Sequence, residues 1–259
     1  MTGAILAGLL WLAFSWGGRW IALVAAIAGA AVLGDLYSRG RSVGLRPQAP
    51  LGLGAVVVLA IVGYLKGDLV SRALVGVVLA LVIATFGEAM VRTDRRRLIE
   101  TVLASVVPAV FVALPVAYLA AMRQMPEGER LVGTLLLCIF AAEATVRVAG
   151  RLTGHGLGGD AAGLSPAGVT RAVAAVVGSL AGSVYARGLF DPAIASSRAT
   201  AIAAVAAVAV AVSQPVAALL ETVAAPGHEK TSRPATIRTA TGMLLAVPFA
   251  FYSFVLLAR

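Results

Sequence analysis

The feature that most constrains this chain is a succession of long apolar runs, which follow one another from the first residues to the last. Short charged, glycine-containing or proline-containing stretches separate most of them. About 20 apolar residues is the length of an α-helix that crosses the hydrocarbon core of a bilayer. Backbone groups find no water there, so a helix is the expected structure of each run. The pattern predicts an all-α, polytopic membrane protein with about nine transmembrane helices.

The composition agrees with this fold class. Charged residues make up 13% of the chain and hydrophobic residues 60%, and the mean hydropathy is +0.94. A soluble domain carries about 25% charged residues, so a surface as apolar as this one requires lipid to cover it. Nine spans and their connections take up nearly all of the 259 residues. We therefore expect a single transmembrane domain over 1–259.

The predicted spans have the approximate bounds 3–16, 20–36, 50–65, 70–90, 98–121, 131–150, 167–187, 199–222 and 240–258. The first two are short for a full crossing, so an inward tilt or local thinning of the bilayer is expected around them. Pro108 and Pro115 lie inside the fifth span, where a kink is expected. Small residues crowd the seventh and eighth spans, which predicts close helix packing or a subunit contact there.

Basic residues are distributed unequally between the two sets of loops. The loops after the second, fourth, sixth and eighth spans hold thirteen Lys and Arg residues, and the opposite loops hold seven. Cytoplasmic loops carry the excess of basic residues, so the asymmetry predicts a plasma-membrane protein with a cytoplasmic N-terminus. It also accounts for the net charge of +9, and no nucleic-acid partner is expected. The single cysteine, Cys138, lies in an apolar run and predicts neither a disulfide framework nor a thiolate metal cluster.

Charged residues at the end of the sixth span give the first candidate site. Glu143 and Arg147 are four residues apart, so they share a helix face and can pair. An ionisable residue inside a membrane helix is a candidate for function because leaving it in lipid is costly. A purely structural ion pair at the interior of the bundle explains the same two residues, and both interpretations stay open here.

A glycine-rich loop follows this pair. It carries Arg151 and His155 among five glycines between residues 150 and 159. Backbone N–H groups and these charges suit a phosphate, although flexible loops are rich in glycine for other reasons as well. Ser165 is then a favourable N-cap and Pro166 a favourable first residue for the next helix. A helix N-terminus beside such a loop favours anions.

These residues resemble the signature region of the phosphatidate cytidylyltransferases, or CDP-diacylglycerol synthases. That family has A-D-T-G-A-Y-x2-G-R-x2-G, a short loop, and then S-P-x-K-T-x-E-G. The residues of this chain at similar spacing are Glu143, Arg151, Gly154, His155, Ser165 and Pro166. Two further stretches are similar to the family, 34–47 to its early segment after the second helix and 244–252 to the A-A-P-x-F-Y run of its last helix.

The resemblance is incomplete at the acidic positions. The family joins CTP to phosphatidic acid and releases pyrophosphate, and acidic residues hold the divalent metal ions. Here the aspartate of A-D-T corresponds to Glu143, but the glutamate of the S-P motif falls at Arg171, and Arg238 falls at the first aspartate of the last motif. The acids of the motif at 213–222 fall at Gln214 and Ala217. A Mg²⁺ site of carboxylates and phosphate oxygens needs such acids.

The resemblance therefore implies a catalytically degenerate relative that acts by lipid binding or as a subunit of a membrane complex. Its expected partners are a membrane phospholipid and further copies of itself or another membrane protein, without a catalytic residue, metal or cofactor. The candidate residues for binding a lipid phosphate are Arg147, Arg151, His155, Ser165, Arg171 and Arg238, with Glu143 as an acidic remnant.

Two alternatives compete with this interpretation. One is an active CTP-dependent cytidylyltransferase on phosphatidic acid or another lipid phosphate, with Mg²⁺ in a rearranged site of Glu143, Asp160 and Glu221. The other is a transporter or flippase, which would need a continuous polar path across the membrane. The seventh and eighth spans have almost no polar residues at mid-membrane, which disfavours transport.

Overall fold

The computed structural model describes residues 17–42, 44–66, 69–92, 98–125, 127–153, 166–190 and 199–212. The regular structure of these residues is entirely helical. The helices are α2 (Gly18–Ser42), α3 (Ala49–Leu65), α4 (Val70–Arg92), α5 (Leu98–Arg123), α6 (Gly128–Leu152), α7 (Pro166–Phe190) and a helix over Ala199–Val212. Among them, α2 and α4 to α7 are long and apolar enough to cross a membrane. The all-α fold and its membrane character are confirmed for this part of the chain.

The predicted bounds agree with the observed ones to within three residues for α3 to α7. The predicted end of the second span at residue 36 is wrong, because α2 continues to Ser42. The spans expected over 3–16 and 240–258, and the second half of the span over 199–222, lie outside the described residues. The count of nine spans stays a prediction.

α2 is longer than expected because its buried face is longer. Ala25, Leu33 and Tyr37 recur on one helix face and are all almost inaccessible. Asp35 and Ser38 end the apolar run in the sequence. In the structure they lie away from the buried face of α2, so they do not end the helix. Burial of Tyr37, which is 1% exposed, therefore carries the helix beyond the predicted end.

The turn after α2 ends that helix with a hydrogen-bonded cap. The Leu45 N–H donates to the Gly40 carbonyl (2.9 Å) and the Gly44 N–H to the Arg41 carbonyl (3.0 Å). These two bonds form a Schellman motif, which requires a left-handed residue after the helix. Gly44 supplies it with a φ of 86°, which costs a glycine little because it has no Cβ.

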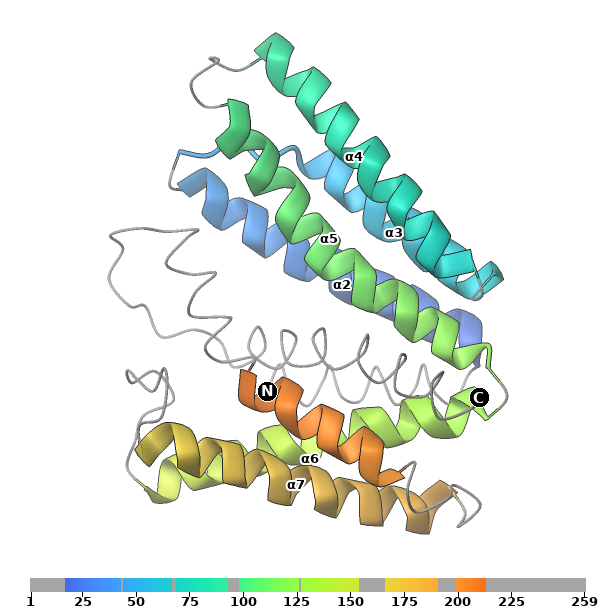
Figure 1. Ribbon diagram of the computed structural model, residues 1–259, viewed down its shortest axis with the longest axis vertical. Coiled ribbons are helices and arrows are strands. Elements are labelled where there is room, and N and C mark those ends of the chain that lie inside the picture. The colour runs from blue at the N-terminus through green and yellow to red at the C-terminus, as the bar shows by residue number, and fades with distance from the viewer. Residues whose placement is uncertain are drawn as a thin grey trace. The chain divides into compact units, whose positions relative to one another are not determined.

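The described residues divide into two compact units, one ending at Met125 and the other beginning at Glu127. In unit 1, α5 packs against α2, α3 and α4, and α3 also contacts α2 and α4 (Figure 1). α5 continues without a break through Pro108 and Pro115. The division bears on packing within each unit, and a single transmembrane domain over 1–259 stays a prediction.

Glycines set the closest helix contacts of unit 1. A Cβ atom added at Gly63 of α3 would collide with the carbonyl oxygen of Ala117 in α5, and would lie 3.1 Å from its carbonyl carbon. A Cβ atom at Gly52 would collide with the hydroxyl group of Tyr37. The α3 backbone therefore approaches α5 and the Tyr37 side chain as closely as only glycine permits.

A buried polar cluster, formed by Tyr37, Gln48, Thr85 and Ser105, joins all four helices of unit 1. The Tyr37 hydroxyl donates to the Ser105 carbonyl (2.6 Å), the Gln48 N–H donates to Ser105 Oγ (2.9 Å), and Gln48 Nε2 donates to the Thr85 carbonyl (3.1 Å). Hydrogen bonds between membrane helices contribute about 0.6 kcal/mol each on average. Since lipid offers no replacement partner, the polar cluster also fixes which residues face each other.

In unit 2, small residues bring α6 and α7 together. A Cβ atom at Gly178 of α7 would lie 2.6 Å from the Ala141 carbonyl oxygen and 2.8 Å from Ala142 Cα, and one at Gly182 would lie 2.9 Å from Cys138 Cα. This is the G-x-x-x-G mode of membrane-helix packing. Ser179 Oγ also donates to the Ala203 carbonyl (2.6 Å), which ties the 199–212 helix to α7. The predicted close packing is confirmed for α7. Its glycines Gly178 and Gly182 pack against α6 of the same chain.

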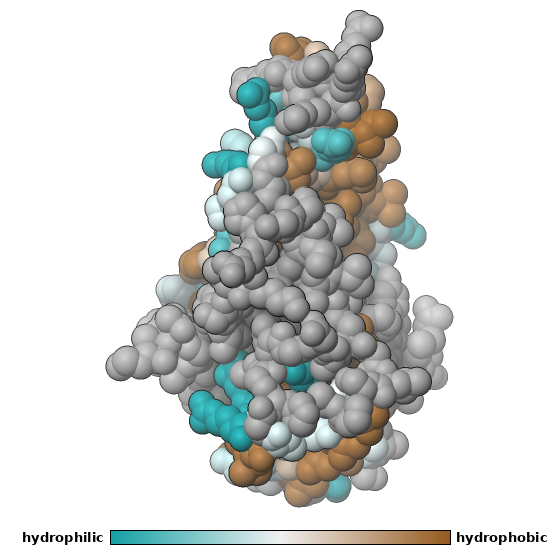
Figure 2. Space-filling model, turned by 90° about the vertical axis from the view of Figure 1, so that its left-hand side faces the viewer, coloured by the Kyte–Doolittle hydropathy of each residue, from teal (hydrophilic) through white to brown (hydrophobic). Residues whose placement is uncertain are grey.

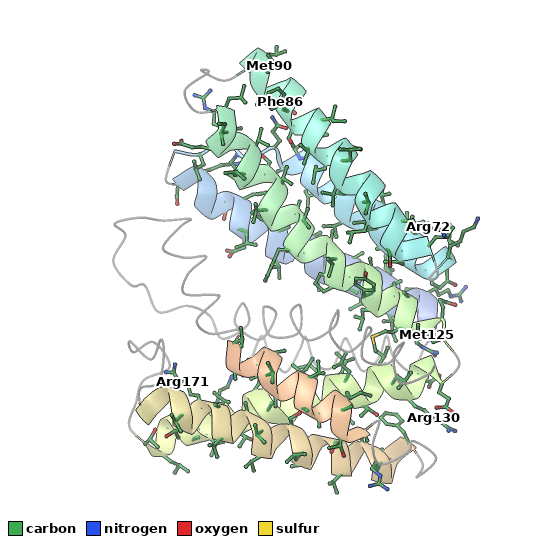
Figure 3. The ribbon with its side chains drawn as sticks, in the orientation of Figure 1. Arg72, Phe86, Met90, Met125, Arg130 and Arg171 are labelled. Atoms are coloured by element: carbon green, nitrogen blue, oxygen red, sulfur yellow. The ribbon has the colours of Figure 1, made fainter. Side chains whose placement is uncertain are left out.

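The helices expose many large apolar side chains, which is unfavourable for a surface in contact with water. On α4, Phe86 and Met90 are 45% and 62% exposed (Figure 3), and Val75 and Ile83 are also exposed. Hydrophobic side chains of the described residues lie open on the face drawn in Figure 2. Patches of this extent mark contact with lipid or with another protein, in agreement with the length of the helices.

Candidate functional site

α6 and α7 run antiparallel, and their glycine contacts fix the register. Gly178 lies opposite Ala142, and Gly182 lies opposite Cys138. The same register brings Arg171 level with the turn of α6 between Arg147 and Arg151. Arg147, Arg151 and Arg171 thus share one end of unit 2, called the arginine end below. Figure 3 shows Arg171 at this end of the helices and Arg130 at the other.

The predicted ion pair at the arginine end is confirmed. Arg147 Nη2 lies 3.6 Å from Glu143 Oε2, and the side chains are 35% and 4% exposed. A charge-assisted hydrogen bond is shorter, at about 2.7–2.9 Å, so this contact is mainly an electrostatic attraction. Burial of Glu143 makes that attraction stronger than it would be in water. The pair therefore holds the Arg147 side chain close to the helix while leaving a third of its surface accessible.

The other two arginines of this end have different surroundings. Arg151 lies in the last turn of α6 and is exposed, where a cation is favoured by the dipole of the helix. Arg171 lies six residues into α7 and is partly buried. Arg171 therefore adds a second partly buried guanidinium group to this end of unit 2, beside that of Arg147.

Negative charge is scarce around these arginines. The described residues of unit 2 contain three acids, Glu127, Glu129 and Glu143. The first two lie at the start of α6, at the end opposite the arginine end. Of these three acids, only Glu143 lies toward the arginine end, so the described residues of this end include three arginines and one acid.

Several predicted site residues lie outside the described residues, namely His155, Ser165 and Arg238, together with Asp160 and Glu221 of the alternative metal site. The prediction that Pro166 is the first residue of the seventh helix is confirmed. The structure brings together Glu143, Arg147, Arg151 and Arg171. Their roles in binding stay a prediction.

No three His, Cys, Asp or Glu side chains within the described ranges lie close enough to hold a metal ion. Cys138 is buried and free, and it lies in the contact between α6 and α7. Sequence reasoning missed the polar cluster of unit 1. The signal was present as a polar residue inside two of the apolar runs, at Thr85 and Ser105, and as Gln48 just before another.

The chemistry that suits the arginine end is binding of an anion with several oxygen atoms. A guanidinium group has a planar set of donors that matches phosphate and carboxylate. Comparison of the chain with protein-family models, with curated proteins and with solved structures finds no match.

Proposed function

We propose that this protein binds the phosphate of an anionic membrane phospholipid at the arginine end and does not turn it over. The observation that carries the proposal is that Arg147, Arg151 and Arg171 share one end of unit 2, where Arg147 pairs with the buried carboxylate of Glu143. The resemblance to phosphatidate cytidylyltransferases, with arginines at acidic positions of the family, supports a catalytically degenerate relative. Such a protein acts through lipid binding or as a subunit of a membrane complex, with further copies of itself or with another membrane protein.

The proposed placement in the membrane follows from the distribution of basic residues. The chain crosses the plasma membrane nine times with its N-terminus in the cytoplasm, and the arginine end faces the cytoplasm, where anionic lipids are concentrated. Each basic residue near such a surface contributes about 1 kcal/mol to the attraction. The arginine end therefore lies on the side of the membrane where its ligand is abundant.

Labelling of single introduced cysteines tests this orientation. Gln124 directly follows α5 and Thr153 directly follows α6, so the proposed topology puts the two residues on opposite sides of the membrane. Both are exposed, and the native Cys138 is buried. We expect a membrane-impermeant maleimide to label Thr153→Cys only from the cytoplasmic side and Gln124→Cys only from the outside. The control is the wild-type protein treated in the same way, which should stay unlabelled because its single cysteine, Cys138, is buried. Labelling with the two sides exchanged would reject the proposed orientation.

Lipid binding is tested with purified full-length protein in a gentle detergent. Native mass spectrometry should show phosphatidic acid retained in preference to phosphatidylcholine. The variant Arg151→Gln/Arg171→Gln removes two of the three charges of the arginine end. It should weaken this retention by about 2 kcal/mol, or about thirtyfold in affinity. The matched control is Arg130→Gln/Arg187→Gln, which removes two arginines from the opposite end of the same helices and should change the retention little.

Two outcomes would contradict the proposal. Equal loss of phosphatidic acid in both double variants would show attraction by net charge alone. Formation of CDP-diacylglycerol from CTP, phosphatidic acid and Mg²⁺ by the purified protein would replace it with the alternative, an active cytidylyltransferase with a rearranged metal site. The same preparation, analysed for co-purified proteins, tests the role as a subunit of a complex.

A further inference from the structure

Charged residues bound the apolar parts of the helices at a nearly constant spacing. Four of the five span-length helices have an accessible charged residue at each end of their apolar stretch. The two charged residues of each pair are sixteen or seventeen positions apart. These pairs are Arg19 and Asp35 in α2, Arg72 and Glu88 in α4, Arg130 and Arg147 in α6, and Arg171 and Arg187 in α7. The fifth helix, α5, differs, because its first and last charged residues, Glu100 and Arg123, are 23 positions apart. The spacing is therefore shared by both units.

This spacing is shorter than a bilayer is thick. Sixteen residues of α-helix rise by about 24 Å, whereas the hydrocarbon core of a typical bilayer is about 30 Å thick. Tilt shortens the projection of a helix on the membrane normal and increases the difference. The apolar stretch of each of these four helices is thus shorter than the hydrocarbon core by about one helical turn, although α2, α4, α6 and α7 are each long enough to cross.

Long basic side chains can make up such a difference by extending toward the headgroups, but two features oppose it at the end of these helices where Asp35, Glu88 and Arg147 lie. Asp35 and Glu88 have short side chains with little reach. Arg147 has the reach but is held in the opposite direction. Side chains on a helix lean toward its N-terminus, which in α6 is the far end from Arg147. Glu143, 3.6 Å from the Arg147 guanidinium, lies one turn further in that direction.

We infer that the bilayer is locally thinned at the arginine end, and that an anionic phospholipid seats its phosphate on Arg147 about one helical turn below the surrounding headgroups. The inference rests on the proposed function and adds a property to it. Because the phosphate must descend to reach Arg147, binding becomes weaker as the surrounding bilayer becomes thicker. Arg151 and Arg171, at the rim of the same end, contact the phosphate from the headgroup side.

The test reconstitutes the full-length protein in phosphatidylcholine vesicles with monounsaturated chains of fourteen, eighteen or twenty-two carbons, each containing the same fraction of phosphatidylglycerol. The measurement is the affinity for phosphatidylglycerol, and soluble glycerol phosphate is the second ligand. We expect the affinity for the lipid to fall about tenfold from the thinnest to the thickest bilayer, and glycerol phosphate not to compete. Competition by glycerol phosphate in every bilayer would show a site for a soluble anion and overturn the inference.

The variant Glu143→Gln separates depth from charge. It releases Arg147, so binding should persist while the dependence on thickness falls below about threefold. Arg187→Gln, at the opposite end of α7, is the control and should keep the full dependence. An unchanged thickness dependence in Glu143→Gln, or equal affinity of the wild-type protein in all three bilayers, would overturn the inference alone. Absence of any preference for anionic lipid in every bilayer would instead overturn the proposed function.

Discussion

Alanine at Gly63 or Gly178 should destabilise the protein by about 1–3 kcal/mol, while alanine at Gly76 or Gly87 should leave it as stable or slightly more so. At Gly63 the added methyl group meets the backbone of Ala117, and at Gly178 it meets the backbone of α6 at 2.6 and 2.8 Å. Backbone atoms cannot rotate away as the end of a side chain can, so the helices must separate and lose their packing contacts.

The control positions make this a matched comparison. Gly76 and Gly87 lie in the interior of α4, a helix long and apolar enough to cross a membrane, and no atom beyond the neighbouring backbone of α4 itself lies within 4 Å of a Cβ added there. In a helix interior, alanine is favoured over glycine by about 0.5–1 kcal/mol. Titration with SDS in mixed micelles, followed by circular dichroism, measures the free energy of unfolding of all four variants. Equal losses of stability at the two packed positions, Gly63 and Gly178, and at the two control positions would contradict the close helix contacts described above.

The ion pair of α6 should respond asymmetrically to the loss of its two partners. Arg147→Leu leaves the carboxyl group of Glu143 buried without its cation, and we expect a loss of about 2 kcal/mol. Removing one partner of a fully buried pair costs about 3–5 kcal/mol, and the value here is lower because Arg147 is 35% exposed. Glu143→Leu should cost less, since the released arginine can extend toward the headgroups.

The double variant Glu143→Leu/Arg147→Leu completes the cycle. Replacing both charges with leucine removes the buried carboxylate together with its cation, so the double variant should be more stable than Arg147→Leu alone. The same SDS titration gives the coupling free energy. If Glu143→Leu is the more destabilising single variant, the carboxylate contributes through other contacts more than through Arg147, and the electrostatic description of this pair fails.

The sequence predicts the helices well because each depends on one local property. An apolar run of sufficient length forms a helix in lipid whatever it packs against, which is why the bounds of α3 to α7 agree within three residues. The pairing of Glu143 with Arg147 was predictable for a similar reason. Residues four apart on a helix are neighbours, and no knowledge of the tertiary structure is needed.

The parts that the sequence did not reveal depend on contacts between helices. The end of α2 depends on Tyr37, whose burial against Gly52 cannot be read from an apolar run that stops at residue 36. The polar cluster depends on Gln48, Thr85 and Ser105, which are far apart in the chain. The register of α6 and α7, which brings Arg171 level with Arg147 and Arg151, likewise follows from the positions of glycines on two helices.

The polar cluster has a consequence for the order in which unit 1 forms during synthesis. Gln48, at the start of α3, directs its backbone N–H to Ser105 of α5 and its side chain to Thr85 of α4. When α2 and α3 have entered the membrane, these groups have no partner until the ribosome has made both later helices. The hydrogen bonds that join α2 and α3 to α5 therefore form only after residue 105 has left the ribosome.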